Sequence, residues 1–320
     1  MDPSLDIVTL GEALIRYSPN MGERLETSSE LHTWIGGAEV NVATNCASVG
    51  LNTAWLGKLP ENPLGRQVCR HLRQYGIRTS GVVSDPSYRM GIYYVELGQA
   101  PRSTQVMYDR ERSAASTMMP GDVDQDLLAR AKVFHTTGIT PALSDGCRET
   151  TISALQQARS AGVRTAFDLN YRAKLWSPNE ARPTLERCLE HVDIAIVAES
   201  EVQQIWAIDG EDTILDWLSE TFNPAHAVVT LGDQGALAQH DGQTYRVQAF
   251  PGETVDPIGT GDAFTAGYLY GLLREADVET ALEYAALLAA FKRTLLGDSV
   301  CITENELEDL WKNQNVEIRR

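Results

Sequence analysis

The sequence is poor in the residues that build disulfide or zinc frameworks, and it has no long apolar run. Its five cysteines are odd in number and never form a Cys-x-x-Cys pair, which fits reduced thiols and argues against a structural zinc. The longest apolar run, residues 281–291, is interrupted by Glu283 and falls short of the roughly 18 to 20 residues that cross a bilayer. Residues 1–10 show no basic or apolar leader. We therefore expect a cytoplasmic protein without a membrane span.

Positive charge is also scarce. Against 44 acidic residues there are 27 basic ones, of which five are lysines, and the net charge is −17. A field of that sign disfavours binding to nucleic acid or to an anionic membrane. An anionic substrate must therefore be held by dedicated cations, and the planar guanidinium of arginine suits a carboxylate better than lysine does. The other proportions, 43% hydrophobic and 22% charged, are those of a globular enzyme.

Two common nucleotide motifs are missing. No Walker A loop (Gly-x4-Gly-Lys-Ser/Thr) occurs, which excludes nucleotide chemistry of the P-loop kind. A Rossmann fingerprint needs a third glycine three residues after Gly261, where Phe264 stands, and it needs the first strand of a βαβ unit before it. A nicotinamide oxidoreductase is therefore disfavoured.

Apolar periodicity alternates between strands and helices along most of the chain. Strands are predicted over 6–10, 53–57, 133–137, 164–168 and 194–197, and helices over 38–47, 64–75, 148–161 and 181–188. An antiparallel meander over 227–231, 235–240 and 243–249 follows, and the chain from Gly261 onward is predicted to be helical. This order predicts a single α/β domain over residues 1–320, with a doubly wound, mainly parallel sheet flanked by helices.

Two segments break the alternation. Residues 91–96 and 105–108 are typical of paired strands around a polar loop, and the turn-rich segment 12–34 could supply further strands. A few strands outside the main α/β sheet could form a lid over a ligand-binding site. We expect a small β-sheet lid from about residues 12–35 and 91–112.

The stretch from Pro257 to Phe264 sets two glycines and an aspartate where a loop turns into a helix. Gly259 and Gly261 allow backbone dihedrals that a side chain would forbid, so successive N–H groups can converge on an anion. Asp262 falls in the first helical turn, where the helix dipole favours negative charge. The stretch predicts an anion cradle with a base inside it, the two parts that phosphoryl transfer to a hydroxyl needs. A helix start merely capped by Thr260 or Asp262 is the alternative.

Further polar residues are predicted at the carboxyl ends of the strands, where ligands of doubly wound sheets bind. Backbone N–H groups at Gly36 and Gly37 precede a helix and could hold a hydroxyl, with Asn41 one turn further on. Strand alternation places Tyr108 and Arg110 on one face, where they could meet a ligand together.

The segment after residue 168 carries polar groups at the alternate positions Asp168, Asn170 and Arg172. Arg172 is a second candidate, beside Arg110, for a substrate carboxylate or a nucleotide phosphate.

A turn and two carboxylates complete the candidate nucleotide side. After Thr230, glycines at 232 and 235 could let backbone N–H groups approach a nucleotide phosphate. Glu201 and Asp256 belong to the same rim, and either carboxylate could orient water around Mg²⁺, which often keeps several waters.

Read together, these segments resemble the ribokinase-like (pfkB) carbohydrate kinases over essentially the whole chain, and the most specific motif is Asp256-Pro-Ile-Gly-Thr-Gly-Asp262. Within that family, Gly-Gly-Ala-Glu-Val-Asn41, Tyr108-Asp-Arg110, the segment 168–176 and Leu296-Gly-Asp298 look most like 2-keto-3-deoxygluconate kinases. The resemblance implies ATP- and Mg²⁺-dependent phosphorylation of the terminal hydroxyl of a 2-keto-3-deoxy sugar acid, with Asp262 as the base.

The resemblance also implies contacts and partners. The expected substrate contacts are Gly37, Asn41, Tyr93, Tyr108, Arg110, Arg172, Asp262 and Asp298. The expected nucleotide contacts are Asn170, Arg172, Thr230, Gly232, Gly235, Gly259, Thr260 and Gly261. A homo-oligomer joined through the lid strands is common in the family.

Two other functions stay open at this point: another sugar kinase, fructokinase first, and a non-catalytic sugar-binding regulator on a kinase fold. The intact Asp262, Gly259 and Gly261 argue against the regulator. Because the pKa of an ordinary aspartate is about 3.9, Asp262 is expected to be ionised at pH 7 without special tuning.

Overall fold

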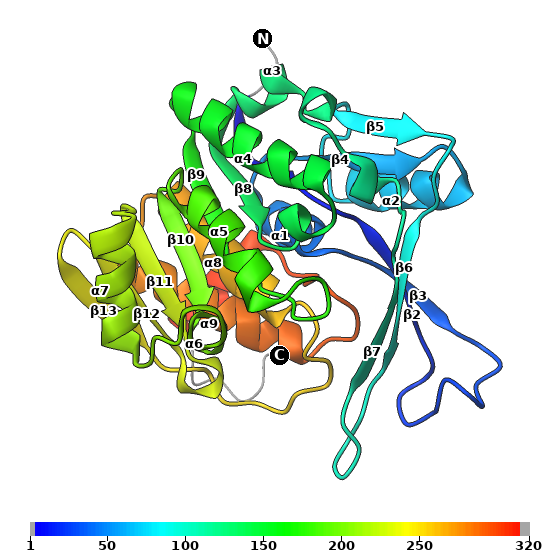
Figure 1. Cartoon of the computed structure of the whole chain (residues 1–320). Helices are drawn as coiled ribbons and strands as arrows, with labels where there is room; N and C mark the ends of the chain where they lie inside the picture. The colour runs from blue at the N-terminus through cyan, green and yellow to red at the C-terminus, as the bar shows by residue number, and fades with distance from the viewer. Residues whose placement is uncertain (1–3, 314–320) are drawn as a thin grey trace.

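A large, mainly parallel sheet forms the body of the molecule in the computed structural model, which describes residues 4–313 (Figure 1). Its strands are β1 (Leu5–Leu10), β4 (Thr53–Pro60), β5 (Val82–Asp85), β8 (Ala131–Thr137), β9 (Arg164–Asp168), β10 (Ile194–Ala198), β11 (His226–Thr230), β12 (Ala236–His240) and β13 (Gln243–Val247). Their order is β13-β12-β11-β10-β9-β8-β1-β4-β5, and β12 alone pairs antiparallel with its two neighbours. All six residues of the central strand β1 are buried, as expected where helices cover both faces.

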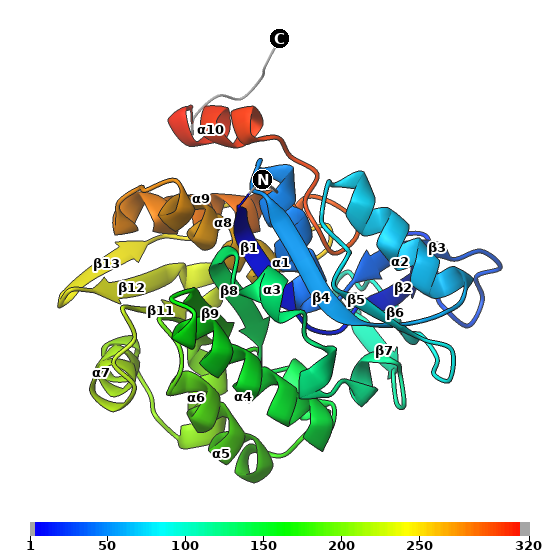
Figure 2. The ribbon, with the colours of Figure 1, turned by 90° about the horizontal axis from the view of Figure 1, so that it is seen from above.

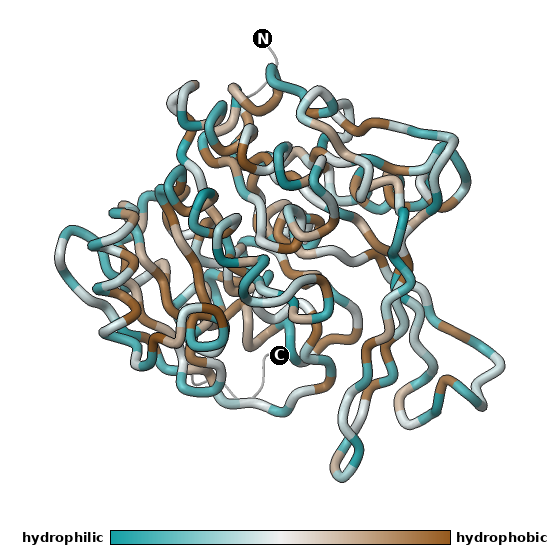
Figure 3. Tube along the Cα trace, in the orientation of Figure 1, coloured by the Kyte–Doolittle hydropathy of each residue, from teal (hydrophilic) through white to brown (hydrophobic). Residues whose placement is uncertain are grey.

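Helices cover the two faces of this sheet in separate layers (Figure 2). One layer holds α1 (Ala38–Ser48), α8 (Thr260–Leu273), α9 (Val278–Arg293) and α10 (Glu304–Lys312), and the other holds α3 (Gln125–Leu128), α4 (Asp145–Ser160), α5 (Pro178–Leu189), α6 (Glu199–Trp206) and α7 (Glu211–Thr221). Because neighbouring strand residues point to opposite faces, Ile7 packs into the first layer and Val8 into the second. Hydrophobic residues follow the strands of the large sheet (Figure 3).

A second, four-stranded sheet projects away from the body (Figure 1). It contains β2 (Leu14–Ser18), β3 (His32–Gly36), β6 (Gly91–Glu96) and β7 (Gln105–Asp109), in the order β3-β2-β6-β7. Ile15 of β2 packs in one hydrophobic cluster with Val68 and Leu72 of α2 (Pro63–Gln74). That helix begins sharply, since the Asn62 side chain accepts hydrogen bonds from the N–H groups of Leu64 and Gly65. The predicted small sheet is therefore present, and its strands lie within about a residue of the predicted ranges.

The predicted α/β architecture is confirmed, and most element boundaries lie within a few residues of the prediction. The pattern missed β5, α3, α6 and α7. Gly210 caps α7 without a side-chain hydrogen bond, so the start of that helix carries no capping signal. The helical C-terminal third is interrupted by residues 294–303, a loop that bears Gly297 and Asp298. Within residues 4–313, no helix is both long and apolar enough to span a membrane.

Candidate active site

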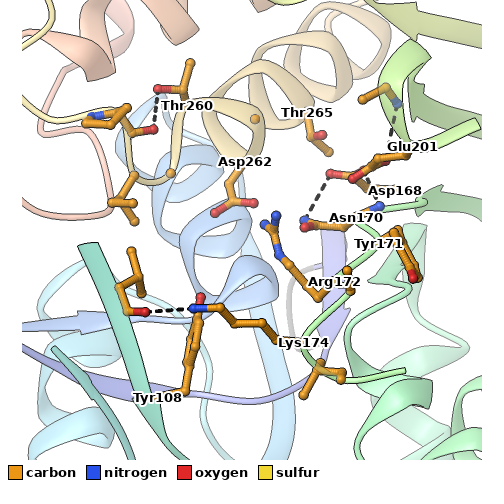
Figure 4. A pocket seen from close by; sticks show the side chains of 18 of the residues that line it. Tyr108, Asp168, Asn170, Tyr171, Arg172, Lys174, Glu201, Thr260, Asp262 and Thr265 are labelled. Carbon is orange, nitrogen blue, oxygen red and sulfur yellow. Dashed lines mark hydrogen bonds between the residues drawn. The ribbon is translucent and has the colours of Figure 1, made fainter. Parts of the chain in front are cut away.

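A cavity of about 1170 Å³ opens between the small sheet and the carboxyl ends of the body strands. Its lining comes from β7, from the segment after β9, from α6 and from the loop that enters α8. Figure 4 shows Asp262, Arg172, Asn170, Asp168 and Glu201 directed toward this space. The position agrees with the general rule for ligands of doubly wound sheets.

The loop that enters α8 needs a glycine at only one of its two glycine positions. Gly259 has a φ of 83°, and a Cβ there would overlap the main-chain oxygen of Asp298, so a side chain is excluded on both counts. Gly261 has no positive φ, and a Cβ at this position would meet no other atom within 4 Å. The prediction of a special dihedral at Gly261 is therefore wrong, and the open space beside it would instead let a ligand approach the backbone. The Thr260 hydroxyl donates to the Pro257 carbonyl at 2.8 Å and stabilises the turn.

Asp262 lies in the first turn of α8 and is 8% exposed. Its Oδ2 accepts a hydrogen bond of 2.6 Å from Nδ2 of Asn41. Burial raises the pKa of the Asp262 carboxyl, while the hydrogen bond from Asn41 and the charges of Arg172 and Lys292 oppose that rise. The expectation that Asp262 has an ordinary pKa is therefore wrong. In this structure, Asn41 orients the predicted base.

Two more carboxylates face the cavity side by side, Asp168 and Glu201 (Figure 4). Burial, followed by repulsion from Glu201, raises the pKa of Asp168 well above its usual range, and burial raises the pKa of Glu201 to about 7. The backbone N–H of Asn170 donates to Oδ1 of Asp168 at 3.2 Å. Such a carboxylate pair, lacking enough cations to neutralise it, fits a divalent ion that keeps several waters. Within the described residues, no group of three or more His, Cys, Asp or Glu side chains forms a metal cage.

Asp256 does not share this setting. Its side chain is fully buried, its Oδ2 lies 2.7 Å from Nη2 of Arg16, and its carboxylate accepts hydrogen bonds from the N–H groups of Ile258 and Gly297 at 3.0 and 3.1 Å. It is not among the residues that line the cavity. The prediction of a water-mediated metal contact from Asp256 does not fit this placement, whereas Asp168 and Glu201 both line the cavity.

The two predicted arginines both line the cavity, but they differ in solvent exposure and in their ion pairs. Arg172 is exposed, and its guanidinium lies between Asp262 and Asn170 in Figure 4. Arg110 is 9% exposed and pairs through Nη2 with the carboxylate of Glu12, which also accepts a hydrogen bond of 2.6 Å from Ser113 Oγ. Its Nε is buried and has no hydrogen-bond partner among residues 4–313, so Arg110 retains a donor for a ligand.

Tyr108 and Arg110 lie on one face as predicted, because Cζ of Arg110 stands 5.3 Å from the Tyr108 ring centroid. Tyr93 stacks on Tyr108 with centroids 5.6 Å apart, but it is buried and its hydroxyl donates to Asp298. Neither Tyr93 nor Asp298 lines the cavity. Asp298 instead lines a smaller cavity of about 430 Å³, together with Trp34 of β3 and His71 of α2. The substrate contacts of Tyr93 and Asp298 stay predictions.

Some of the remaining predicted residues line the cavity and others do not. Gly37, at the start of α1, does not line it. It has a φ of 121°, and a Cβ there would overlap the main-chain oxygen of Glu12. Thr230 lines the cavity, whereas Gly232 and Gly235, both with positive φ, do not. Sequence reasoning missed Lys174, whose Nζ donates to the Val106 carbonyl of β7 at 3.0 Å and so joins the body to the small sheet. A lone loop lysine carries no signal that could have revealed this contact.

A buried aspartate in the first turn of a glycine-entered helix, set beside a carboxylate pair beneath a β-sheet cover, suits phosphoryl transfer to a hydroxyl. Comparison with known proteins agrees: residues 4–305 match the model of the pfkB family carbohydrate kinases. The chain belongs to this family.

Individual relatives cover nearly the whole chain. The 2-dehydro-3-deoxygalactonokinase of Haloferax volcanii is 45% identical over 316 residues, which span 98% of this chain and 99% of that protein. The crystal structure of 2-dehydro-3-deoxygluconokinase from Thermotoga maritima superposes with a TM-score of 0.91 at 31% identity and covers 96% of this chain and 99% of that one. A putative ribokinase II from E. coli, in complex with ATP and Mg²⁺, has the same fold with a TM-score of 0.89 at 21% identity, covering 97% and 100%.

Proposed function

We propose that this kinase phosphorylates the terminal hydroxyl of 2-keto-3-deoxygluconate with ATP and Mg²⁺, and that the epimer 2-keto-3-deoxygalactonate is a second acceptor. Relatives named for the galacto and the gluco compound, at 45% and 31% identity, support this choice of substrate class. The observation that carries the proposal is the position of Asp262, buried in the first turn of α8 and held by Asn41 at the edge of a cavity that also presents two arginines.

In the proposed reaction, Asp262 accepts a hydrogen bond from the attacking hydroxyl and takes its proton as the bond to phosphorus forms. The transition state of phosphoryl transfer is loose, so positioning and electrostatics supply most of the catalysis. Backbone N–H groups at residues 259–261 and the N-terminus of α8 would stabilise charge on the transferring group. The small sheet would exclude water, which competes with the sugar as acceptor.

The nucleotide side of the proposal rests on Asp168, Glu201, Thr230 and Arg172, which line the same part of the cavity. A bound Mg²⁺ neutralises charge on the nucleotide phosphates. Asp168 and Glu201 would hold it, largely through water, because they are neighbouring carboxylates on the cavity wall and carboxylate oxygens suit Mg²⁺. Arg172 would bind phosphate oxygens, for which its planar guanidinium is suited.

On the sugar side, Arg110 is the proposed partner of the substrate carboxylate. Its buried Nε is a free donor, and Tyr108 lies beside it. Pairing with Glu12 holds the guanidinium in place, and the Glu12 carboxylate partly offsets its positive charge. Gly37 would present its N–H to a sugar hydroxyl at the start of α1.

A phosphoryl-transfer assay tests the proposal and both alternatives. The purified protein is given ATP and Mg²⁺ with 2-keto-3-deoxygluconate, 2-keto-3-deoxygalactonate, fructose or ribose. The proposal expects kcat/KM for the two sugar acids to exceed that for either neutral sugar. Preference for fructose would establish the fructokinase alternative, and the absence of turnover with every acceptor would favour the sugar-binding regulator.

We also propose a homo-oligomer joined through the lid strands, and a cytoplasmic location. The edge strand β7 carries Met107 and Tyr108, which are 48% and 43% exposed. Open strand edges and exposed apolar side chains favour association. Light scattering after size-exclusion chromatography measures the molar mass of the protein in solution. A monomeric mass at all concentrations would contradict the proposed homo-oligomer.

A further inference from the structure

The small sheet and the loop that enters α8 are joined by a buried arginine. Arg16 of β2 is fully buried, and it contacts two carboxylates that lie more than two hundred residues further along the chain. Its Nη2 lies 2.7 Å from Oδ2 of Asp256, and its Nη1 lies 2.7 Å from Oδ1 of Asp298. The third side, Nε, donates to Ser18 at 2.9 Å, and the centroid of the Trp34 ring lies 5.1 Å from Cζ. The guanidinium is thus held by hydrogen bonds from Nε and Nη1, by the ion pair of Nη2 with Asp256 and by the Trp34 ring against one face.

Both carboxylates are attached to the loop that enters α8. Asp256 accepts the N–H of Ile258 and therefore fixes the first turn of that loop. The main chain of Asp298 packs against Gly259 so closely that a Cβ at Gly259 would overlap its carbonyl oxygen. The two carboxylate residues therefore hold the loop at its start and at the glycine beside α8, and Arg16 determines the distance between them.

A second buried cation lies under the same loop. Nζ of Lys292, a fully buried side chain of α9, donates to the main-chain oxygens of Asp256 and Leu295 at 3.0 and 3.3 Å. Burying a charge carries a large desolvation cost even when the charge is paired. A cluster of two cations and two carboxylates is therefore a poor source of stability, and it is better explained by the geometry that it imposes.

The same cluster also reaches the sugar side of the cavity. A Cβ at Gly36, in the glycine pair before α1, would overlap the Asp298 carboxylate and would lie 2.5 Å from the Tyr93 hydroxyl. Tyr93 belongs to β6 and stacks on Tyr108 of β7. A continuous set of contacts therefore runs from Tyr108 through Tyr93 to Asp298, and from the main chain of Asp298 to Gly259.

We propose that Arg16 is a positioning residue that couples the lid to the phosphate-binding loop, so that sugar bound under the lid prepares the loop for ATP. The inference deepens the proposed function, on which it rests, and it gives Asp256 a role in the coupling instead of a metal contact. No chemical step passes through these residues.

The test uses Asp298→Asn and Arg16→Lys, which keep side-chain size while they weaken the cluster. The readouts are kcat, the KM of the sugar and the Kd of a non-hydrolysable ATP analogue with and without saturating sugar. The ratio of the two Kd values measures the coupling. Arg89→Met is the matched control, because Arg89 also forms a lid ion pair, with Asp109, but one that is exposed and remote from the loop. Thermal unfolding verifies that each variant is folded.

In the wild type, sugar is expected to tighten binding of the ATP analogue. Both cluster variants should lower kcat about 10- to 100-fold, the effect of a small misplacement of catalytic groups, and bring the Kd ratio close to one. Arg89→Met should keep both values. A wild-type ratio of one, or folded cluster variants that keep kcat and the ratio, would overturn the proposal.

A higher KM with an unchanged ratio would also overturn it, and would support Asp298 as a substrate contact. If the wild type does not phosphorylate the sugar acids, the substrate assignment fails on its own. The coupling is then measured with whichever acceptor of the panel is phosphorylated, so the two failures remain distinct.

Discussion

Nδ2 of Asn41, on α1, lies 2.6 Å from Oδ2 of Asp262, on α8. The hydrogen bond joins two helices of one layer and fixes one oxygen of the predicted base, leaving the other toward the cavity. Burial raises the pKa of Asp262 and this hydrogen bond lowers it, so Asn41 is one of the groups that set the pH at which the base becomes ionised.

Replacing Asn41 by leucine should move the acid limb of the kcat profile to higher pH. Asp262 must be ionised to accept a proton, so activity falls as pH falls through its pKa. Because the hydrogen bond from Asn41 lowers this pKa, its loss raises the pKa and moves the fall in activity to higher pH. The profile of kcat against pH between about 5 and 9 measures the shift. A limb that stays in place would show that Asn41 does not tune the base.

Arg110→Ala should reduce kcat/KM for the sugar acids by about 10- to 100-fold more than for fructose. A charge-assisted hydrogen bond to the substrate carboxylate is worth about 1.5 to 3 kcal/mol, and a neutral sugar cannot form it. Arg112→Ala is the control, because Arg112 is exposed and outside the cavity lining. Equal losses for both acceptors would remove the carboxylate role from Arg110.

Glu201→Gln should raise the Mg²⁺ concentration needed for half-maximal activity by about 10-fold or more, the usual cost of losing a supporting metal contact. Titration of activity with MgCl₂ at fixed ATP measures this. Glu199→Gln on the same helix, outside the cavity lining, is the comparison. If both variants titrate like the wild type, the carboxylate pair does not hold the ion.

Glu39→Gln should stabilise the fold at pH 8 more than at pH 5. Glu39 is buried, and its Oε1 accepts hydrogen bonds from the backbone and hydroxyl of Thr137 and from the hydroxyl of Thr140. Burial raises its pKa from 4.5 to about 7, so the folded state holds a proton that the unfolded state releases between these values. Stability is therefore lost as pH rises through that window.

The neutral glutamine keeps Oε1 and avoids this loss. The gain at pH 8 relative to pH 5 should be at most about 3 kcal/mol, the equivalent of the pKa change. Urea unfolding at the two pH values measures it. If the substitution changes the free energy of unfolding by the same amount at pH 5 and at pH 8, Glu39 is ionised in the folded state.

Local pattern predicted the architecture well, because the strands of a buried parallel sheet are short apolar runs separated by helical periodicity. The segment Arg164–Asp168 was predicted with its observed bounds. The positive φ of Gly259 and the place of Asp262 in the first turn of α8 were also predictable, since both follow from local sequence. Asp168 and Arg172 reach the cavity because both follow one strand.

Partnerships across the chain were not predictable. In the sequence, Asp256 and Glu201 are both carboxylates at the carboxyl ends of the strands. Only the fold reveals that Asp256 forms an ion pair with Arg16 while Glu201 faces the cavity. The pairing of Arg110 with Glu12 spans 98 residues and depends on how the end of β7 meets the end of β1. The raised pKa of Asp262 likewise follows from burial, which no motif encodes.

The most direct test of the central claim is the turnover of Asp262→Asn with ATP, Mg²⁺ and 2-keto-3-deoxygluconate. Asparagine keeps the shape and the contact with Asn41 but cannot accept the proton. We predict that kcat falls by about two to four orders of magnitude, while the Kd of the sugar changes little. Near-normal kcat in the folded variant would contradict the assignment of Asp262 as the base.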